Sequence, residues 1–403
     1  MRPEIVKTDM RRMDYLDGLR GLAALWVVLS HFSAFVVPDL TRLPWPYVLV
    51  LSGLHHARMA VVVFLVLSGY CLALPQASGK AFQFVSWMKR RWLRIMPPYL
   101  AALLLSLAVT FPHKASATVF HFGPVTWHHS PAYLRDAVGH LLMLHDLWFA
   151  RFPWDQNGTN AALWSIPVEF HLYLLFPLLL LAWRQGGIVR TALSGLALSW
   201  ALNYLAQTTL LGEVNFAGMT LLYLGFFTLG MMAAMITHSH SPESARLRRL
   251  PWGCVSALSL LAGSLVCGFK GWDWYMGNAD TVALFFAVSA AAFLVWQHGQ
   301  PQGVSSRWLS HPQLVALGAF SYSVYLIHIP VILVYCHILA CVNVAHPLGP
   351  ILQLWLAVVV GLPLILAASY VFHLIFERPF LVRRGKSVMQ PARPDVLNPV
   401  LGL

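Results

Sequence analysis

Long apolar segments recur along the whole chain and are separated by shorter polar stretches. Ten of these segments have roughly the 20 residues that an α-helix needs to cross the hydrocarbon core of a membrane. They are residues 15–37, 54–74, 93–111, 162–183, 189–210, 218–237, 252–269, 279–296, 313–336 and 351–376. The pattern therefore predicts an all-α integral membrane protein with ten transmembrane helices.

The composition supports this interpretation. Hydrophobic residues make up 58% of the chain and charged residues 10%, whereas about 25% of residues are charged in soluble globular chains. So little charge excludes a soluble enzyme, a disordered protein and a nucleic-acid-binding protein. Two segments are less sharply bounded than the others, because Arg58 interrupts the start of the second and little separates the fourth from the fifth.

The positive charge indicates how the chain is oriented. The formal net charge is +12, and most of the 27 Lys and Arg residues fall in the loops on the side that holds both termini. Cytosolic loops of membrane proteins are enriched in Lys and Arg. We therefore predict that both termini are cytosolic, and the net charge needs no nucleic-acid partner to explain it.

The remaining connections define the domain organisation. Residues 112–161 form one long loop on the outer side, rich in His, Trp and Pro. We expect residues 1–386 to form a single transmembrane domain and residues 387–403 to form a disordered cytosolic tail. We find no internal repeat of the kind on which many transporters are built.

Cysteine and histidine patterns give no sign of a metal or disulfide framework. The 5 cysteines include no CxxC pair, and the 18 histidines include no HExxH motif. The histidine pairs lie in loops without carboxylate or cysteine partners at ligand spacing. We expect no metal site. We also find no glycine-rich loop that would bind ATP phosphates.

The first apolar segment carries two ionisable residues, Arg20 and His31. Because a helix turns 100° per residue, positions eleven apart share one face, with His31 about 16 Å further along the axis. An arginine near the cytosolic end and a histidine beyond mid-membrane would line one path. The alternatives are an interfacial anchor for Arg20 and a structural, hydrogen-bonded role for His31.

A second group of basic residues lies at the cytosolic edge of the third segment. Arg91 and Arg94 are three residues apart, so both face the same side of a helix. Two guanidinium groups on one face suit a phosphate or pyrophosphate. The alternative is plain cytosolic charge that sets the topology.

Glu169 lies in the outer half of the fourth segment, within Trp164-Ser165-Ile166-Pro167-Val168-Glu169. A carboxylate in a membrane needs a cation, an imidazole or a proton as a partner. We therefore consider an acid–base dyad of Glu169 and His31, in which the carboxylate raises the basicity of the imidazole. The alternative is a Glu169 whose hydrogen bonds come from loop backbone.

Smaller polar signals complete the candidate site. Ser68-Gly69 would allow a close helix or ligand approach, and His328 lies in the outer half of the ninth segment. Glu377-Arg378 at a helix end is more typical of a local ion pair. The residues expected to line the site are Asp17, Ser68, Tyr70, Trp164 and His328.

Several motifs occur in a fixed order that resembles the membrane-bound acyltransferase-3 family. They are Leu16-Asp17-Gly18-Leu19-Arg20-Gly21-Leu22-Ala23 with His31, Phe64-Leu65-Val66-Leu67-Ser68-Gly69-Tyr70, Arg91-x-x-Arg94, Leu163-Trp164-Ser165-Ile166-Pro167-Val168-Glu169-Phe170, Ser321-Tyr322-Ser323-Val324-Tyr325-Leu326-Ile327-His328 and Glu377-Arg378-Pro379. The ordered set spans residues 14–380. One departure is Leu65, where many members have a phenylalanine.

The resemblance implies a bacterial inner-membrane O-acyltransferase. Such an enzyme takes an acyl group, usually acetyl from acetyl-CoA, on the cytosolic side and delivers it to a hydroxyl of a saccharide that is extracytoplasmic or lipid-linked. Acyl-CoA would be a co-substrate and not a bound cofactor. By resemblance, His31 is the catalytic histidine, Arg20 belongs to the same motif, Arg91 and Arg94 bind donor phosphates, and Glu169 matches a family position. The chain resembles the form that lacks an appended esterase-like domain.

Two routes and one rival function follow. His31 would remove the proton of the acceptor hydroxyl, or it would carry the acyl group itself as an acyl-histidine. The rival is a proton-coupled transporter or flippase of a polar or lipid-linked solute. In that case His31 and Glu169 would carry protons, and the arginines would bind an anionic head group. The sequence identifies neither the acceptor nor the oligomeric state.

Overall fold

The computed structural model of the protein describes residues 14–37, 39–110, 137–144, 160–208 and 220–381. These residues are helical or irregular and include no strand. Within them, 9 helical segments are long and apolar enough to cross a membrane. The predicted fold class, an all-α integral membrane protein, is confirmed. The cytosolic position of the termini stays a prediction, and the expected tail, residues 387–403, lies outside the described residues.

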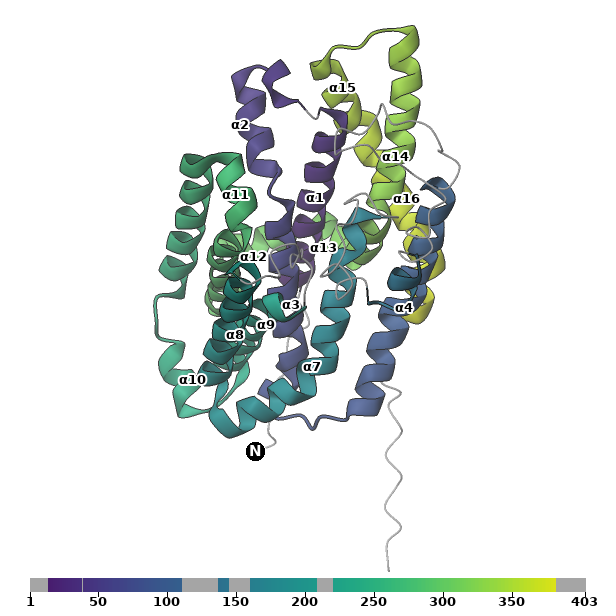
Figure 1. Ribbon diagram of the computed structural model, residues 1–403. Helices are drawn as coiled ribbons and strands as arrows, with labels where there is room; N and C mark the ends of the chain where they lie inside the picture. Colours follow the sequence, from purple (N-terminus) through teal and green to yellow (C-terminus); the bar gives the residue numbers. More distant parts are fainter. Residues whose placement is uncertain (1–13, 38, 111–136, 145–159, 209–219, 382–403) are drawn as a thin grey trace, which may run out of the picture.

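Figure 1 shows the helices of the described residues in their order along the chain. They are α1 (Asp14–Val36), α2 (Trp45–Leu54), α3 (Ala57–Ala77), α4 (Phe84–Thr110), α7 (Ser165–Gly186), α8 (Ile188–Thr208), α9 (Leu224–His238), α10 (Pro242–Leu247), α11 (Trp252–His298), α12 (Val304–Leu309), α13 (Pro312–Ala319), α14 (Ser321–Ala345), α15 (Pro350–Leu356) and α16 (Leu362–Phe372). Single turns η3 (Ala161–Trp164), η5 (Thr220–Tyr223), η6 (Ala357–Gly361) and η7 (His373–Glu377) lie between or beside them.

Two of the predicted segments differ from the structure. The fifth, residues 189–210, forms α8, which is 21 residues long and packs against α7 and α9. It is not among the 9 apolar segments, because residues such as Arg190 and Asn203 lower its hydropathy. The ninth, residues 313–336, is divided at Phe320 into the short helix α13 and the spanning helix α14.

Helix α11 supplies two of the predicted segments by folding back on itself. It is 47 residues long, yet the Ser256 hydroxyl donates to the Ser289 carbonyl at 3.0 Å. The Ser259 hydroxyl likewise donates to the Phe285 carbonyl at 2.9 Å. The two halves therefore lie side by side, and each is long enough to span a membrane.

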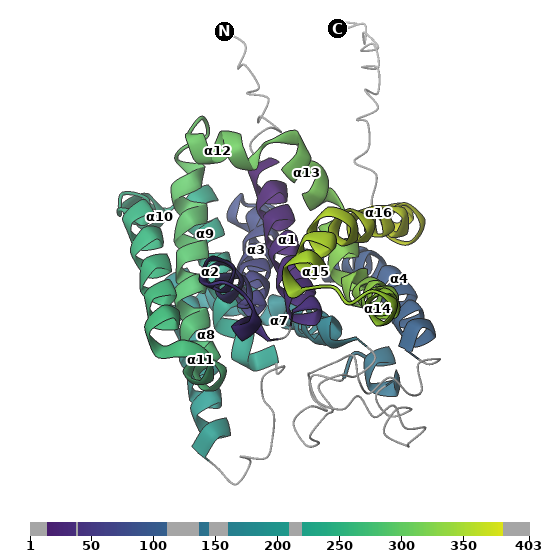
Figure 2. The ribbon, with the colours of Figure 1, turned by 90° about the horizontal axis from the view of Figure 1, so that it is seen from above.

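Helix α1 runs through the middle of the bundle (Figures 1 and 2). Seen from above, α3 and α9 lie on one side of it, and α14, α15 and α16 lie on the other. The short helices α12 and α13 press against its first turns, which carry Arg20. Two glycines allow this close contact. A Cβ atom on Gly18 would lie 1.8 Å from the Leu309 carbonyl oxygen, and a Cβ atom on Gly318 would lie 1.8 Å from the Asp17 carbonyl oxygen.

Close backbone contact also joins α3 to α9. A Cβ on Gly69 would lie 2.0 Å from the Phe227 carbonyl oxygen, and one on Gly230 would lie 2.0 Å from that of Val66. Small residues let membrane helices approach in this way. The predicted close helix approach at Ser68-Gly69 is therefore confirmed, and it fixes the face of α3 on which Ser68 lies.

Buried polar residues tie distant helices together. Arg58 of α3 pairs with Asp280 of α11 and donates to the Tyr223 hydroxyl at 2.8 Å. Glu377, with 2% of its surface exposed, does not form the expected ion pair with Arg378. Its carboxylate instead accepts from Ser323 at 2.5 Å and contacts His373 Nδ1 at 2.8 Å, because the helix end packs its carboxylate inward.

Candidate functional site

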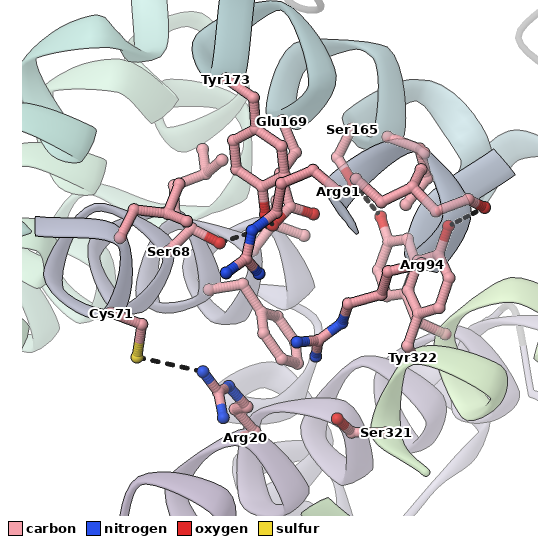
Figure 3. A pocket seen from close by; sticks show the side chains of 17 residues that line it. Arg20, Ser68, Cys71, Arg91, Arg94, Ser165, Glu169, Tyr173, Ser321 and Tyr322 are labelled. Carbon is pink, nitrogen blue, oxygen red and sulfur yellow. Dashed lines mark hydrogen bonds between the residues drawn. The ribbon is translucent and has the colours of Figure 1, made fainter. Parts of the chain in front are cut away.

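A polar cavity of about 100 Å³ lies between α1, α3, α4, α7 and α14 (Figure 3). Its apolar wall includes Val61, Phe64 and Ile166. The polar residues that line it are Arg20, Ser68, Cys71, Arg91, Arg94, Ser165, Glu169, Tyr173, Ser321, Tyr322 and Tyr325. Each of the five helices therefore contributes polar side chains to one shared space.

Three guanidinium groups turn toward this space (Figure 3). Arg20 pairs with Asp17 at 2.6 Å and donates to Cys71 Sγ at 3.1 Å. Arg91 and Arg94 come from successive turns of α4, as their spacing predicts, and neither has an ion pair within the part of the chain that the structure describes. The Nε atom of Arg91 is buried and has no hydrogen-bond partner there. Arg91 and Arg94 thus bring positive charge to the cavity without a direct ion pair among the described residues.

Glu169 is the one carboxylate among the described residues that line the cavity. Its Oε1 atom accepts a hydrogen bond from the Ser68 hydroxyl at 2.5 Å and another from the Tyr173 hydroxyl. Even when Asp17, the partner of Arg20, is counted with Glu169, two carboxylates face three guanidinium groups and leave an excess of positive charge. Such a site favours an anionic ligand, and guanidinium forks match phosphate geometry in particular.

A wall of aromatic residues leads from the cavity toward α14. The hydroxyls of Tyr325 and Ser165 are hydrogen-bonded at 2.7 Å, and the Tyr322 hydroxyl donates to the Ile95 carbonyl at 3.1 Å. The Tyr325 ring also packs on His328, with the ring centroids 5.8 Å apart. Tyr325 therefore touches both the cavity and the histidine behind it.

His31 lies outside the cavity and contacts His328 instead. The two rings are 5.1 Å apart between centroids, and His31 Nδ1 lies 3.2 Å from His328 Nε2. His31 Nδ1 also lies 3.1 Å from the Val27 carbonyl. His328 is fully buried, whereas His31 keeps part of its surface exposed.

The structure brings together five of the predicted site residues: Arg20, Ser68, Arg91, Arg94 and Glu169. The other candidates do not line the cavity. Asp17 reaches it only through Arg20, the Tyr70 hydroxyl accepts from Thr237 at 3.3 Å, Trp164 packs on Tyr223 with ring centroids 5.5 Å apart, and His31 and His328 pair with each other.

The expected dyad of His31 and Glu169 is not formed. Glu169 is held by Ser68 and Tyr173, and the partner of His31 is His328. Glu169 also lines the same cavity as Arg91, although the sequence pattern placed the two near opposite sides of the membrane. The reason is that Arg91 lies about two turns from the start of α4 and Glu169 about one turn from the start of α7, and the packing of the two helices brings them to one level.

Sequence reasoning missed several lining residues, among them Cys71, Tyr173 and Tyr325. A signal was available for two of them. Cys71 follows Ser68 by three residues and Tyr173 follows Glu169 by four, and such positions share a helix face. Tyr325 lies in the same motif as His328, which is three residues further along the helix, but only His328 was considered as a site residue of that motif.

Comparison with known proteins places the chain in a family. The acyltransferase-3 family model, described as an acyltransferase domain, matches residues 13–374. The chain belongs to the acyltransferase-3 family, as the ordered motifs predict. No solved structure shows a significant match.

Curated relatives are similar over different shares of the chain. O-acetyltransferase OatA of Staphylococcus aureus is 24% identical over 343 residues, which is 80% of this chain and 51% of OatA. Acyltransferase MdmB of Streptomyces mycarofaciens is 27% identical over 359 residues, or 82% of this chain and 81% of MdmB. An O-acetyl transferase of Shigella phage Sf6 is 27% identical over 169 residues, which is 41% of this chain and 45% of the phage protein. This chain spans about half the length of OatA.

Proposed function

We propose that this protein is a membrane O-acyltransferase. It moves an acyl group, in the simplest case acetyl, from cytosolic acyl-CoA to a hydroxyl of a saccharide that is extracytoplasmic or lipid-linked. The observation that carries the proposal is the convergence of Arg20, Arg91 and Arg94 on one cavity in the membrane-spanning bundle. Family membership and the names of the relatives favour this chemistry over the transporter alternative.

The arginine cavity suits the phosphate end of the donor. Coenzyme A carries its phosphates at one end and the thioester at the other, and an extended pantetheine arm joins them. In this arrangement the cavity holds the phosphate end of the donor, and the rest of the donor extends beyond it. Arg91, whose buried Nε lacks a partner, then gains one from the ligand.

His31 is the proposed base. It lies eleven residues beyond Arg20 on α1, about 16 Å along the helix axis, a distance that the pantetheine arm can span. To reach His31 from the cavity, the arm passes the rings of Phe64 and Tyr325, which line the cavity wall. The acceptor approaches His31 through its exposed side.

The reaction balances without a cofactor. His31 takes the proton of the acceptor hydroxyl, and the oxygen attacks the thioester carbonyl. The carbon–sulfur bond then breaks, coenzyme A leaves as a thiolate, and the thiolate takes the proton from His31. Glu169 holds its place among the arginines, where it offsets part of their positive charge when the donor is absent.

The proposed location is a bacterial inner membrane with both termini in the cytosol. The distribution of Lys and Arg supports this orientation, because it places the arginine-bearing end of α4 on the side where acyl-CoA is made. The protein needs the acceptor saccharide on or near the outer side.

Radiolabelled acetyl-CoA tests the proposal in membranes that contain the protein. We expect label in a saccharide fraction, and a matching loss of acyl mass from the surface saccharide when the protein is deleted from its host. Label that remains with coenzyme A, together with uptake or flipping of a solute by the same membranes, would instead support the transporter.

A further inference from the structure

We propose that His328 is a positioning residue that sets the tautomer of His31. Together with the Val27 carbonyl, it holds the proton of His31 on Nδ1 and so leaves the lone pair on Nε2, the nitrogen that takes the acceptor proton. The inference rests on the proposed function, because it concerns the same base. It assigns to a second imidazole the orienting role that a carboxylate has in other acyl-transfer sites.

The hydrogen bonds of His328 define its own protonation. Its Nδ1 atom lies 2.8 Å from the Tyr325 carbonyl and 3.2 Å from the Val324 carbonyl. A carbonyl oxygen accepts hydrogen bonds and cannot donate them, so Nδ1 carries a hydrogen. His328 is fully buried, and a buried imidazole without a counter-charge is neutral. The lone pair of His328 is therefore on Nε2.

That lone pair faces His31. The His328 Nε2 atom lies 3.2 Å from His31 Nδ1, and His31 Nδ1 also lies 3.1 Å from the Val27 carbonyl. Both neighbours are acceptors, so His31 Nδ1 must be the donor. In neutral His31 the other nitrogen, Nε2, is then unprotonated and able to act as a base.

The same contact serves the reaction after proton transfer. When His31 Nε2 takes the proton of the acceptor hydroxyl, the ring becomes positively charged. Its Nδ1–H then donates to His328 Nε2 and the Val27 carbonyl in charge-assisted hydrogen bonds, which are stronger than neutral ones. His328 thus stabilises the charged His31 and keeps the ring oriented, while the proton leaves through Nε2 to the coenzyme A thiolate.

Two substitutions of His328 separate positioning from packing. His328→Leu fills the space but offers no acceptor, whereas the amide of His328→Gln places an acceptor near the position of Nε2. In membrane assays, we expect the leucine variant to lose about 100-fold in kcat with its KM for acetyl-CoA unchanged. The glutamine variant should recover to within about 10-fold of the parent protein.

A double variant tests whether His328 acts through His31. We expect His31→Ala with His328→Leu to transfer the acyl group no more slowly than His31→Ala alone. Once His31 is absent, His328 has no base to position, so its substitution costs no further activity. Protein amount in the membrane, measured by immunoblot, normalises every rate. Should the leucine variant fail to accumulate, His328→Phe is the second apolar variant.

Specific outcomes overturn the inference and leave the proposed function standing. The inference fails if His328→Leu or His328→Phe keeps a near-parental kcat while His31→Ala abolishes transfer. Equal losses in the glutamine and leucine variants would also overturn it, since an acceptor would then not matter. If the parent protein itself transfers no acyl group, the proposed function fails.

Discussion

Arg20 donates to the Sγ atom of Cys71 at 3.1 Å, which joins α1 to α3 at the edge of the cavity. The other terminal nitrogen of Arg20 pairs with Asp17 at 2.6 Å. A thiol therefore lies beside a guanidinium group inside the space that we assign to the donor phosphates. This contact makes Cys71 a chemical probe of that space.

Donor binding should protect Cys71 from alkylation. In a variant whose other cysteines are replaced by alanine, we expect acetyl-CoA to slow the reaction of Cys71 with a small maleimide by about 10-fold or more, because the occupied cavity excludes the reagent. A matched variant that keeps only Cys254, which is exposed on α11, should react at one rate with or without the donor. Equal rates at Cys71 would argue against donor binding in this cavity.

The arginine pair of α4 should control donor use. We expect Arg91→Ala with Arg94→Ala to raise the KM for acetyl-CoA by about 100-fold or more, because each of the two lost guanidinium–phosphate contacts costs roughly 1.5–3 kcal/mol. The kcat at saturating donor should change less.

Arg90 provides the control for that experiment. It is exposed on the same helix and does not line the cavity, so Arg90→Ala removes a positive charge without touching the site. We expect its KM to match that of the parent protein. If Arg90→Ala raises the KM as much as the pair does, the arginines act through topology or surface charge.

Glu169 should matter most when the cavity is empty. Glu169→Gln keeps the shape of the side chain but leaves Arg91 and Arg94 without a carboxylate in the cavity, while Arg20 keeps its ion pair with Asp17. We expect a lower Tm for the variant in detergent, and a larger rise in Tm on adding acetyl-CoA than the parent protein shows. Ser68→Ala, which keeps the carboxylate, should lower the Tm less. A Glu169→Gln variant with parental Tm and parental response would contradict this role.

The contact between α3 and α9 should tolerate no side chain at Gly69. A methyl group there would lie 2.0 Å from the Phe227 carbonyl oxygen, so Gly69→Ala forces the helices apart and should cost about 1–3 kcal/mol of stability. The control is Gly53→Ala, because a Cβ at Gly53 meets nothing within 4 Å. Thermal unfolding in detergent measures the stability of both variants against that of the parent protein. Equal melting temperatures would show that the two helices are not in close contact.

The sequence predicted most of the fold because membrane spanning depends on local composition. Each run of apolar residues indicated a helix from its own composition, and the set of runs indicated the fold class. The exceptions depend on detail that hydropathy does not carry. Residues 189–210 are helical but too polar to count among the apolar spans, and the break at Phe320 separates α13 from α14.

The site was predictable only within single helices. The spacing of Arg91 and Arg94 correctly placed both on one face, since the geometry of one helix determines it. The partner of His31 was not predictable, because His328 is 297 residues away in the chain and only helix packing brings the two rings together. The expected pairing with Glu169 was wrong for the same reason.

The most direct test of the central claim compares His31→Ala with the parent protein in membranes supplied with radiolabelled acetyl-CoA. His337→Ala, an exposed histidine on α14, is the matched control, and immunoblotting confirms equal amounts of each protein. We predict that label reaches a saccharide acceptor with the parent and the His337 variant, and that His31→Ala lowers transfer by at least about 100-fold. Transfer at the parental rate by His31→Ala would contradict the account.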